Sequence, residues 1–194
     1  MGTEVTYFDL ATMYFERGNR EKAVEYHRLA LERFEQIIAE NSEDIEFVFI
    51  TASKVHLLGF TLLGNMVHLG EDSGLAKEYC TLARKTFEEL SESFPTNLAF
   101  PEMLVSFAEQ CGEMYKDADK MEAAALEFEY ARKHLEVLYE SCPENYSYGI
   151  RLFGTLNNLG IAYSDSGEQE KGKEYFEKAI AFNLRSRSPL PRRP

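Results

Sequence analysis

The sequence predicts an all-α protein of about eight helices, arranged as repeated antiparallel pairs. The main observation is that small residues return at a fixed interval of 48 residues. They are Gly64, Gly112 and Gly160 in one phase, and Ala83, Ala131 and Ala179 in another. A fixed period of this length indicates a stacked array in which one structural unit is repeated.

The last copy shows the pattern within one unit. Leu159 and Gly160 are followed by Tyr163 three residues later, by a Ser-Gly turn, and then by Phe176. The glycine allows two helices to approach closely, and the aromatic residue fills the space beside it. A fourth copy opens the chain, with Ala11 at the glycine position and an offset of 53 residues to the next copy.

This combination of Leu-Gly-x-x-Tyr, a turn glycine and Ala-x3-Phe-x2-Ala resembles the tetratricopeptide repeat. The resemblance covers residues 5–184 and implies a right-handed α-solenoid. The usual unit of that family has 34 residues, whereas the period here is 48 residues. The difference equals about four helical turns, or two per helix, so every buried position stays on its face. The chain therefore resembles a long-helix variant of the family.

Turn residues separate the expected helices in order. Gly18 and Asn19 end the first helix, and Pro95 and Pro143 end two later ones, because proline cannot continue a helix. Pro101 fits the first turn of its helix. The expected helices span 4–17, 20–40, 44–69, 74–92, 98–116, 119–140, 144–165 and 168–184. They form the pairs 4–41, 44–94, 97–142 and 144–184, and residues 185–194 form a basic, proline-rich tail.

Residues 44–69 are the most apolar segment and are long enough to span a bilayer. Lys54 and His56 argue against a membrane span, because a charge near the bilayer centre is costly. An inner helix of an array, covered by its neighbours, accounts for the apolar composition. We therefore expect no membrane association.

The net charge of −12 makes nucleic acid a poor partner, because phosphate binding needs a basic surface. The tail contains four arginines and no acid, so the rest of the chain carries 17 basic against 33 acidic residues, a net charge of −16. Cys80 and Cys111 are expected to be buried small hydrophobes, and Cys142 to be accessible beside Pro143. Their spacing predicts a reducing compartment. With no secretory leader at the start, we expect a cytoplasmic protein.

No sequence motif points to catalysis, and we expect no enzyme activity, no cofactor and no metal site. HExxH, GxSxG, P-loop and GxGxxG patterns are absent from the sequence. The four histidines lack metal-ligand spacing, and His27 occupies a core aromatic position of the repeat. It is expected to be a packing residue with its hydrogen bonds satisfied.

Binding of another protein is the remaining function. In the family that the chain resembles, the first helices of the pairs line a concave groove that holds peptides. The groove positions here are Phe8, Thr12, Phe15 and Glu16 in the first copy, and Thr61, Asn65, His68 and Leu69 in the second. They continue with Glu109, Glu113, Lys116 and Asp117 in the third, and with Asn157, Ile161, Ser164 and Asp165 in the fourth. The cations that clamp a carboxylate terminus in many family members are missing.

The acids at positions 109, 113, 117 and 165 favour a basic or mixed basic-apolar peptide, with Phe8, Phe15, Leu69 and Ile161 as apolar anchors. The leading hypothesis is therefore a non-catalytic interaction scaffold. Two alternatives remain open: self-assembly through uncapped array ends or through the tail, and a regulatory segment of a larger enzyme or signalling protein. The groove acids are also explained by a solvated face.

Overall fold

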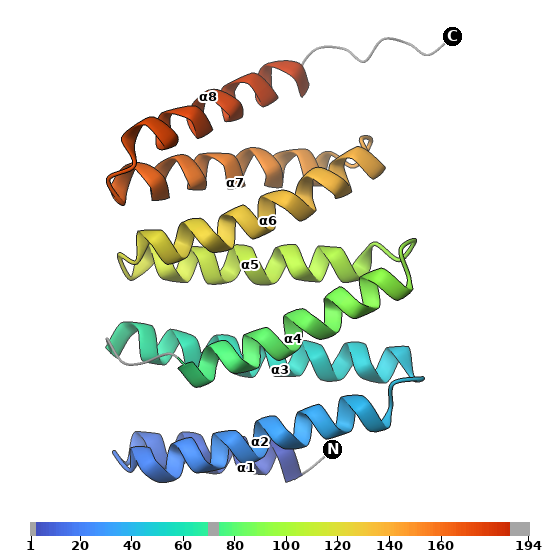
Figure 1. Cartoon of the computed structure of the whole chain (residues 1–194), viewed down its shortest axis with the longest axis vertical. Helices are drawn as coiled ribbons and strands as arrows, with labels where there is room; N and C mark the ends of the chain where they lie inside the picture. The colour runs from blue at the N-terminus through green and yellow to red at the C-terminus, as the bar shows by residue number, and fades with distance from the viewer. Residues whose placement is uncertain (1–2, 70–73, 187–194) are drawn as a thin grey trace. The chain divides into compact units, whose positions relative to one another are not determined.

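The computed structural model describes residues 3–69 and 74–186, which form eight α-helices and no β-strand. The helices are α1 (Thr3–Glu16), α2 (Arg20–Glu40), α3 (Ile45–Leu69), α4 (Gly74–Ser93), α5 (Ala99–Asp117), α6 (Met121–Ser141), α7 (Tyr146–Asp165) and α8 (Gln169–Ser186). Consecutive helices run antiparallel as pairs (Figure 1). The predicted all-α class is confirmed.

The chain divides into two compact units, Met1–Pro95 and Thr96–Pro194, and each contains two helix pairs. The union of all four pairs in one right-handed array over residues 5–184 stays a prediction. Helix α8 continues to Ser186, two residues into the segment predicted as tail, and residues 187–194 lie outside the described residues.

Three of the pairs share one turn geometry between their helices. Gly18, Asp119 and Gly167 occupy the same repeat position, with φ angles of 75°, 58° and 93°. This left-handed conformation closes a helix by returning two backbone N–H groups to the carbonyls of its last turn. In the first pair, Gly18 N donates to Phe15 O at 2.9 Å and Asn19 N to Tyr14 O at 2.9 Å.

Side-chain caps fix several helix starts. The side chain of Asn19 accepts from Lys22 N at 3.2 Å at the start of α2. The side chain of Asn145 accepts from Ser147 N at 3.1 Å at the start of α7. Asp44 precedes α3, and its Oδ1 accepts from Phe47 N at 3.0 Å. Each cap satisfies a backbone N–H that lacks a partner in the first turn.

The periodic glycines hold the pairs of the second unit together, as the sequence predicted for Gly112 and Gly160. A Cβ atom on Gly112 would lie 2.6 Å from Phe128 Cε1, and one on Gly160 would lie 2.6 Å from Phe176 Cδ1. In the first unit the close contact belongs to Gly59, where a Cβ atom would lie 2.6 Å from the Cβ of Tyr79. Gly64 is half-buried, and its predicted contact stays a prediction.

The register at Gly59 corrects one expectation about the cysteines. Cys80 was expected to be buried, but it is only half-buried. The reason is that α4 turns the neighbouring Tyr79 into the core, where its side chain is fully buried. Cys111 is buried as predicted, and Cys142 is half-buried.

Helix α3 contains the segment Ile45–Gly64, which is long and apolar enough to cross a membrane by length and composition. Of its apolar window, 44% is buried inside the structure, including Val48, Ala52 and Val55. The core helix of a soluble protein has the same composition, so the expected absence of membrane association stays a prediction.

Candidate protein-binding surface

The predicted groove residues of the first unit do not form one accessible set. Phe8 is buried, and its ring packs edge-on against His27 and Tyr79, so it cannot serve as an exposed apolar anchor. Thr12 donates its hydroxyl to Phe8 O at 3.1 Å. The remaining positions vary: Glu16 and Thr61 are exposed, Phe15 is half-buried, and the side chains of Asn65, His68 and Leu69 lie outside the described residues.

In the second unit, two predicted groove acids of α5 are already paired with α7. Glu109 Oε2 accepts from Arg151 Nη2 at 2.8 Å and from Arg151 Nε at 3.1 Å, and its Oε1 accepts from Thr155 Oγ1 at 3.2 Å. Both members of this ion pair are about three-quarters buried, with side-chain exposures of 26% and 25%. Glu109 therefore joins successive helix pairs and is not a free ligand for a basic peptide.

Glu113 belongs to a second polar cluster between the same helices. Its Oε1 accepts from Asn158 Nδ2 at 2.6 Å, and its Oε2 pairs with Lys116 Nζ at 2.5 Å. Lys116 also donates to Asn158 Oδ1 at 3.2 Å. The predicted acidic cluster is thus largely neutralised, and only Asp117 and Asp165 remain exposed.

An accessible strip follows one face of α7. We call its members, at helical spacings of four or seven residues, the α7 strip: Tyr146, Ile150, Asn157, Ile161 and Asp165. Tyr146, Ile150 and Ile161 have exposures of 81%, 71% and 37%. The strip includes three predicted site residues, Asn157, Ile161 and Asp165, while Ile150 and Tyr146 lie about two and three turns before Asn157. Asn157 is held in place by donating to Phe153 O at 3.0 Å.

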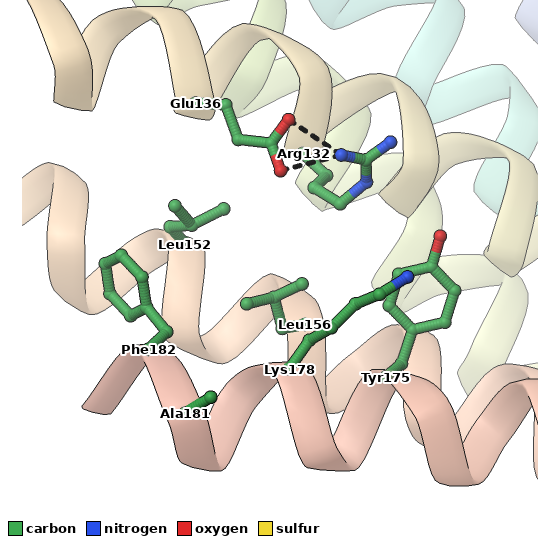
Figure 2. Close-up of a pocket in the computed structure, with 8 residues that line it drawn as sticks. All are labelled: Arg132, Glu136, Leu152, Leu156, Tyr175, Lys178, Ala181 and Phe182. Atoms are coloured by element: carbon green, nitrogen blue, oxygen red, sulfur yellow. Dashed lines mark hydrogen bonds and ion pairs between the residues drawn. The ribbon is translucent and has the colours of Figure 1, made fainter. Parts of the chain in front are cut away.

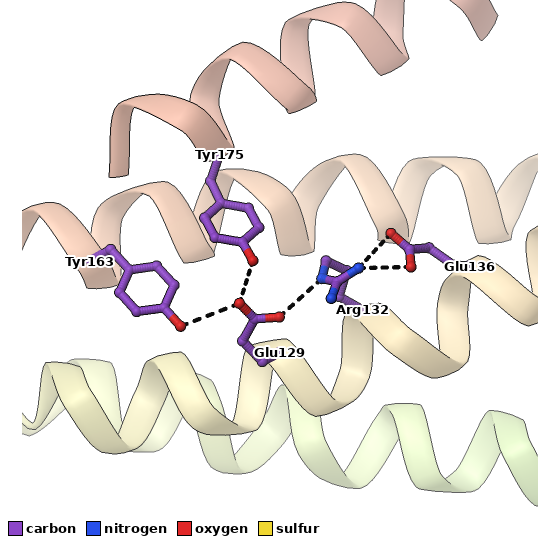
Figure 3. Close-up of polar contacts among 5 residues, drawn as sticks. All are labelled: Glu129, Arg132, Glu136, Tyr163 and Tyr175. Carbon is purple, nitrogen blue, oxygen red and sulfur yellow. Dashed lines mark hydrogen bonds and ion pairs between the residues drawn. The ribbon is translucent and has the colours of Figure 1, made fainter. Parts of the chain in front are cut away.

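A separate acceptor, Glu129 of α6, connects the third and fourth pairs (Figure 3). One carboxylate oxygen accepts from the Tyr163 hydroxyl at 3.2 Å and also from the Tyr175 hydroxyl. The other accepts from Arg132 Nε at 3.0 Å, and Arg132 in turn pairs with Glu136 at 2.7 Å. The sequence did not predict this network, although Tyr14 and Tyr26 of the first pair have the same spacing as Tyr163 and Tyr175.

The network shifts the pKa values of its members. Burial raises the pKa of the Glu129 carboxyl, but the hydrogen bonds from Tyr175 and Arg132 outweigh burial and leave this pKa below its usual value. Burial and the hydrogen bond to Glu129 raise the pKa of the Tyr175 hydroxyl. Outside this network, Tyr148, which donates to Glu102, has its pKa raised to about 12, mainly by burial. Glu129 is therefore a charged acceptor between two neutral tyrosine hydroxyls and the cationic Arg132.

A pocket of about 310 Å³ lies beside this network, between α6, α7 and α8 (Figure 2). Its lining residues are Arg132, Glu136, Leu152, Leu156, Tyr175, Lys178, Ala181 and Phe182. A corresponding pocket of about 370 Å³ lies between α2 and α4, where Leu31, Glu35, Leu82 and Lys85 occupy the repeat positions of Arg132, Glu136, Lys178 and Ala181. Because the lining charges differ, the two pockets reflect the repeat geometry and do not indicate a shared ligand.

His27 is buried, and its Nε2 has no hydrogen-bond partner among the described residues. The expectation that the hydrogen bonds of His27 are satisfied is therefore wrong for Nε2. The neighbouring Tyr79 donates its hydroxyl to the backbone oxygen of His27 at 2.8 Å, and this hydroxyl lies 3.5 Å from the other ring nitrogen, Nδ1. Burial lowers the pKa of His27 to about 4. Among the described residues, no group of three or more His, Cys, Asp or Glu side chains could hold a metal ion.

The arrangement in helix pairs agrees with the comparison with known protein families. Residues 5–44 and residues 153–184 each match a model described as tetratricopeptide repeat. Tetratricopeptide repeats therefore lie in the first and last helix pairs of the chain. No curated protein matches the sequence.

A solved structure titled as the crystal structure of BtubC (BKLC) from P. vanneervenii has a similar fold. Its TM-score is 0.52 with 24% sequence identity, and the alignment covers 98% of this chain and 68% of that chain. At this identity the likeness supports the fold alone.

Proposed function

We propose that this protein is a non-catalytic scaffold that binds a mixed basic-apolar segment of another protein along the α7 strip. Tetratricopeptide repeats generally mediate protein interactions, which gives the coarse function. The observation that carries the proposal is the exposure of Tyr146, Ile150 and Ile161 on one helix face. Large apolar side chains in such a row are typical of surfaces that bind a partner.

The charge of the surroundings favours a ligand with basic residues. Asp165 ends the strip and is exposed, as is Asp117 at the end of α5, while Glu144 lies just before α7. The chain has a net charge of −12, so it attracts cationic segments at long range. Because Arg151 and Lys116 neutralise Glu109 and Glu113, we assign affinity to the apolar anchors and charge selectivity to these outer acids.

Fluorescence anisotropy with three labelled peptides tests the proposal. The first peptide combines Leu and Phe at helical spacing with Lys, the second replaces each Lys by Glu, and the third replaces each Leu and Phe by Ser. We expect the first peptide alone to bind. The double variant Ile150→Ser with Ile161→Ser should weaken its binding at least about tenfold, a loss of about 1.4 kcal/mol.

The matched control is Leu126→Ser, which removes an apolar residue of α6 that is 72% exposed but lies outside the strip. This variant should bind the first peptide like the unmodified protein. Equal binding of the acidic peptide, equal weakening by the control, or no binding of the first peptide would overturn the proposal.

A further inference from the structure

A three-residue cluster of the last helix pair is repeated in the first pair. In the last pair, the rings of Tyr163 and Tyr175 stack at 5.5 Å, and Lys171 Nζ lies 3.7 Å from the Tyr163 ring centroid. In the first pair, Tyr14 and Tyr26 stack at 5.5 Å, and Lys22 Nζ lies 5.1 Å from the Tyr14 ring centroid. Each residue of one cluster lies 149 positions from its counterpart.

The two clusters differ in what their hydroxyl groups contact. Tyr163 and Tyr175 both donate to Glu129 of the preceding pair. Tyr14 and Tyr26 are half-buried, and no carboxylate among the described residues accepts from their hydroxyls. The first pair therefore presents the hydrogen-bond donors of this contact, and the acceptor is missing from the described part of the chain.

The acceptor half is repeated in the last helix of the chain. Glu177 of α8 lies 48 residues after Glu129, at the same repeat position, and it is exposed. Ile180 and Leu184 follow at the positions of Arg132 and Glu136, with exposures of 59% and 66%. We call Glu177, Ile180 and Leu184 the α8 end face.

The apolar residues of the two faces also match. Inside the second unit, Arg132 and Glu136 share a pocket with Leu156 and Lys178. The first-pair counterparts of Leu156 and Lys178 are Tyr7, whose ring lies 6.3 Å from that of Tyr26, and Leu29, which is 37% exposed. We call Tyr7, Tyr14, Tyr26 and Leu29 the tyrosine face.

On the α8 end face, Ile180 and Leu184 therefore stand where the internal contact has the charged Arg132 and Glu136. On the tyrosine face, Leu29 likewise stands where the internal contact has the charged Lys178. Ile180 and Leu184 would meet Tyr7 and Leu29, where Arg132 and Glu136 meet Leu156 and Lys178. Burial of such apolar side chains from both sides stabilises association, whereas either face alone leaves them in water.

We propose that the α8 end face of one copy of this protein docks on the tyrosine face of a second copy. Glu177 accepts hydrogen bonds from the Tyr14 and Tyr26 hydroxyls in this contact, as Glu129 does from Tyr163 and Tyr175. The two faces differ, so the contact is heterologous and each docked copy leaves one face of each kind available. Association therefore proceeds beyond a dimer.

Sedimentation velocity over a roughly hundredfold range of protein concentration tests the proposal. The average mass of the full chain should rise with concentration past that of a dimer. Ile180→Lys, on the α8 end face, and Leu29→Lys, on the tyrosine face, should each be monomeric over the range. Both positions are exposed, and circular dichroism checks that the two variants keep the helical content of the unmodified protein.

An equimolar mixture of the two variants gives the sharpest result. Each blocked copy keeps the face that the other lacks, so the mixture should form dimers and nothing larger. Glu177→Gln should weaken association several-fold, because a neutral amide accepts weaker hydrogen bonds from the tyrosines. The matched control is Glu174→Gln. The counterpart of Glu174 in α6 is Leu126, which is 72% exposed although the last pair packs against α6. Glu174 is therefore expected to lie outside the contact.

A full chain that stays monomeric at every concentration would overturn the proposal. A mixture of the variants that fails to dimerise, or a Glu174→Gln control that associates as weakly as Glu177→Gln, would overturn it as well. The docked copy would also bring its α1 towards the α7 strip. Peptide binding is therefore measured at concentrations where the protein is monomeric, and the two proposals can fail independently.

Discussion

Gly112 of α5 lies directly against the ring of Phe128 of α6, so closely that a Cβ atom on Gly112 would be 2.6 Å from Phe128 Cε1. The ring is fully buried and cannot move aside. Gly112→Ala should therefore lower the free energy of unfolding, because the overpacking cost of roughly 1–3 kcal/mol exceeds the gain in helix propensity. Urea denaturation followed by circular dichroism measures the change.

Gly154 of α7 provides the matched control for this substitution. A Cβ atom at Gly154 would meet nothing within 4 Å, although the residue lies inside a helix of the same unit. Gly154→Ala should raise the free energy of unfolding by about 0.5–1 kcal/mol, because alanine loses less backbone entropy than glycine. Changes of the same sign in the two variants would contradict the close contact.

Asp119 adopts a left-handed backbone conformation, with φ of 58°, at a position that the first and last pairs fill with glycine. A side chain with a Cβ atom costs roughly 1–2 kcal/mol in this region, although aspartate tolerates it better than most residues. Asp119→Gly should raise the urea midpoint, whereas Gly167→Asp should lower it. Two shifts in the same direction would show that backbone strain does not govern this turn.

His27 should make stability depend on pH below neutrality. Burial lowers its pKa from 6.5 to about 4, so the unfolded chain binds a proton that the folded chain does not bind between these values. The stabilisation by neutral His27 is complete above pH 6.5 and decreases as the pH falls towards about 4. The full loss is up to about 3 kcal/mol, at 1.36 kcal/mol per unit.

Urea midpoints of the unmodified protein and of His27→Gln, measured from pH 7 to pH 4, test this dependence. The variant lacks the titrating group, so its stability should fall less steeply. His56 is buried, and its pKa is also lowered to about 4, by burial and by the charge of Arg84. His56 remains in both proteins and contributes equally. Parallel pH profiles would show that His27 titrates normally in the fold.

The periodic positions were predictable because packing repeats: Gly112 and Gly160 meet aromatic rings at the same spacing in two pairs. The pairing of the groove acids Glu109 and Glu113 with residues of α7 was not predictable. Repeat phase places Glu109 on a helix face, but it does not show that Arg151, 42 residues later, covers that face. The one sequence feature that could have indicated this ion pair is that Arg151 is the single Lys or Arg between Lys133 and Lys171.

Phe8 is a second residue whose environment the repeat predicted wrongly. Its repeat position suggested an exposed anchor, yet the aromatic contacts with His27 and Tyr79 bury it. The first pair contacts the second through its own set of large side chains, and the offset of 53 residues removes the regular phase that would have revealed this. A regular period predicts a fold better than it predicts which side chains of an irregular copy face solvent.

The three cysteines should differ in their reaction with a thiol reagent in the native state. Cys111 is 2% exposed and should react slowly, only when the surrounding helices open. Cys80 and Cys142 are half-buried and should react faster. Ellman's reagent with the single variants Cys80→Ser and Cys142→Ser assigns the phases. Equal and rapid reaction of all three thiols would contradict the packing around Cys111.

Glu129 should be the polar side chain on which the contact between the third and fourth pairs depends most. It accepts from Tyr163, Tyr175 and Arg132, so Glu129→Gln weakens three hydrogen bonds and leaves Arg132 paired only with Glu136. Hydrogen bonds to a charged group contribute more than neutral ones, and we expect a loss of about 2 kcal/mol at neutral pH.

This loss should itself depend on pH. The pKa of Glu129 is lowered in the folded protein, so its stabilisation is present above the ordinary carboxyl pKa of 4.5 and is lost as the pH falls through the lower, folded value. The difference in urea midpoint between the unmodified protein and Glu129→Gln should therefore be largest at neutral pH and shrink in acid. Glu136→Gln is the matched control, because Glu136 is 45% exposed and contacts only Arg132 within the network. A control variant as destabilised as Glu129→Gln, or a difference that grows in acid, would contradict the role assigned to Glu129.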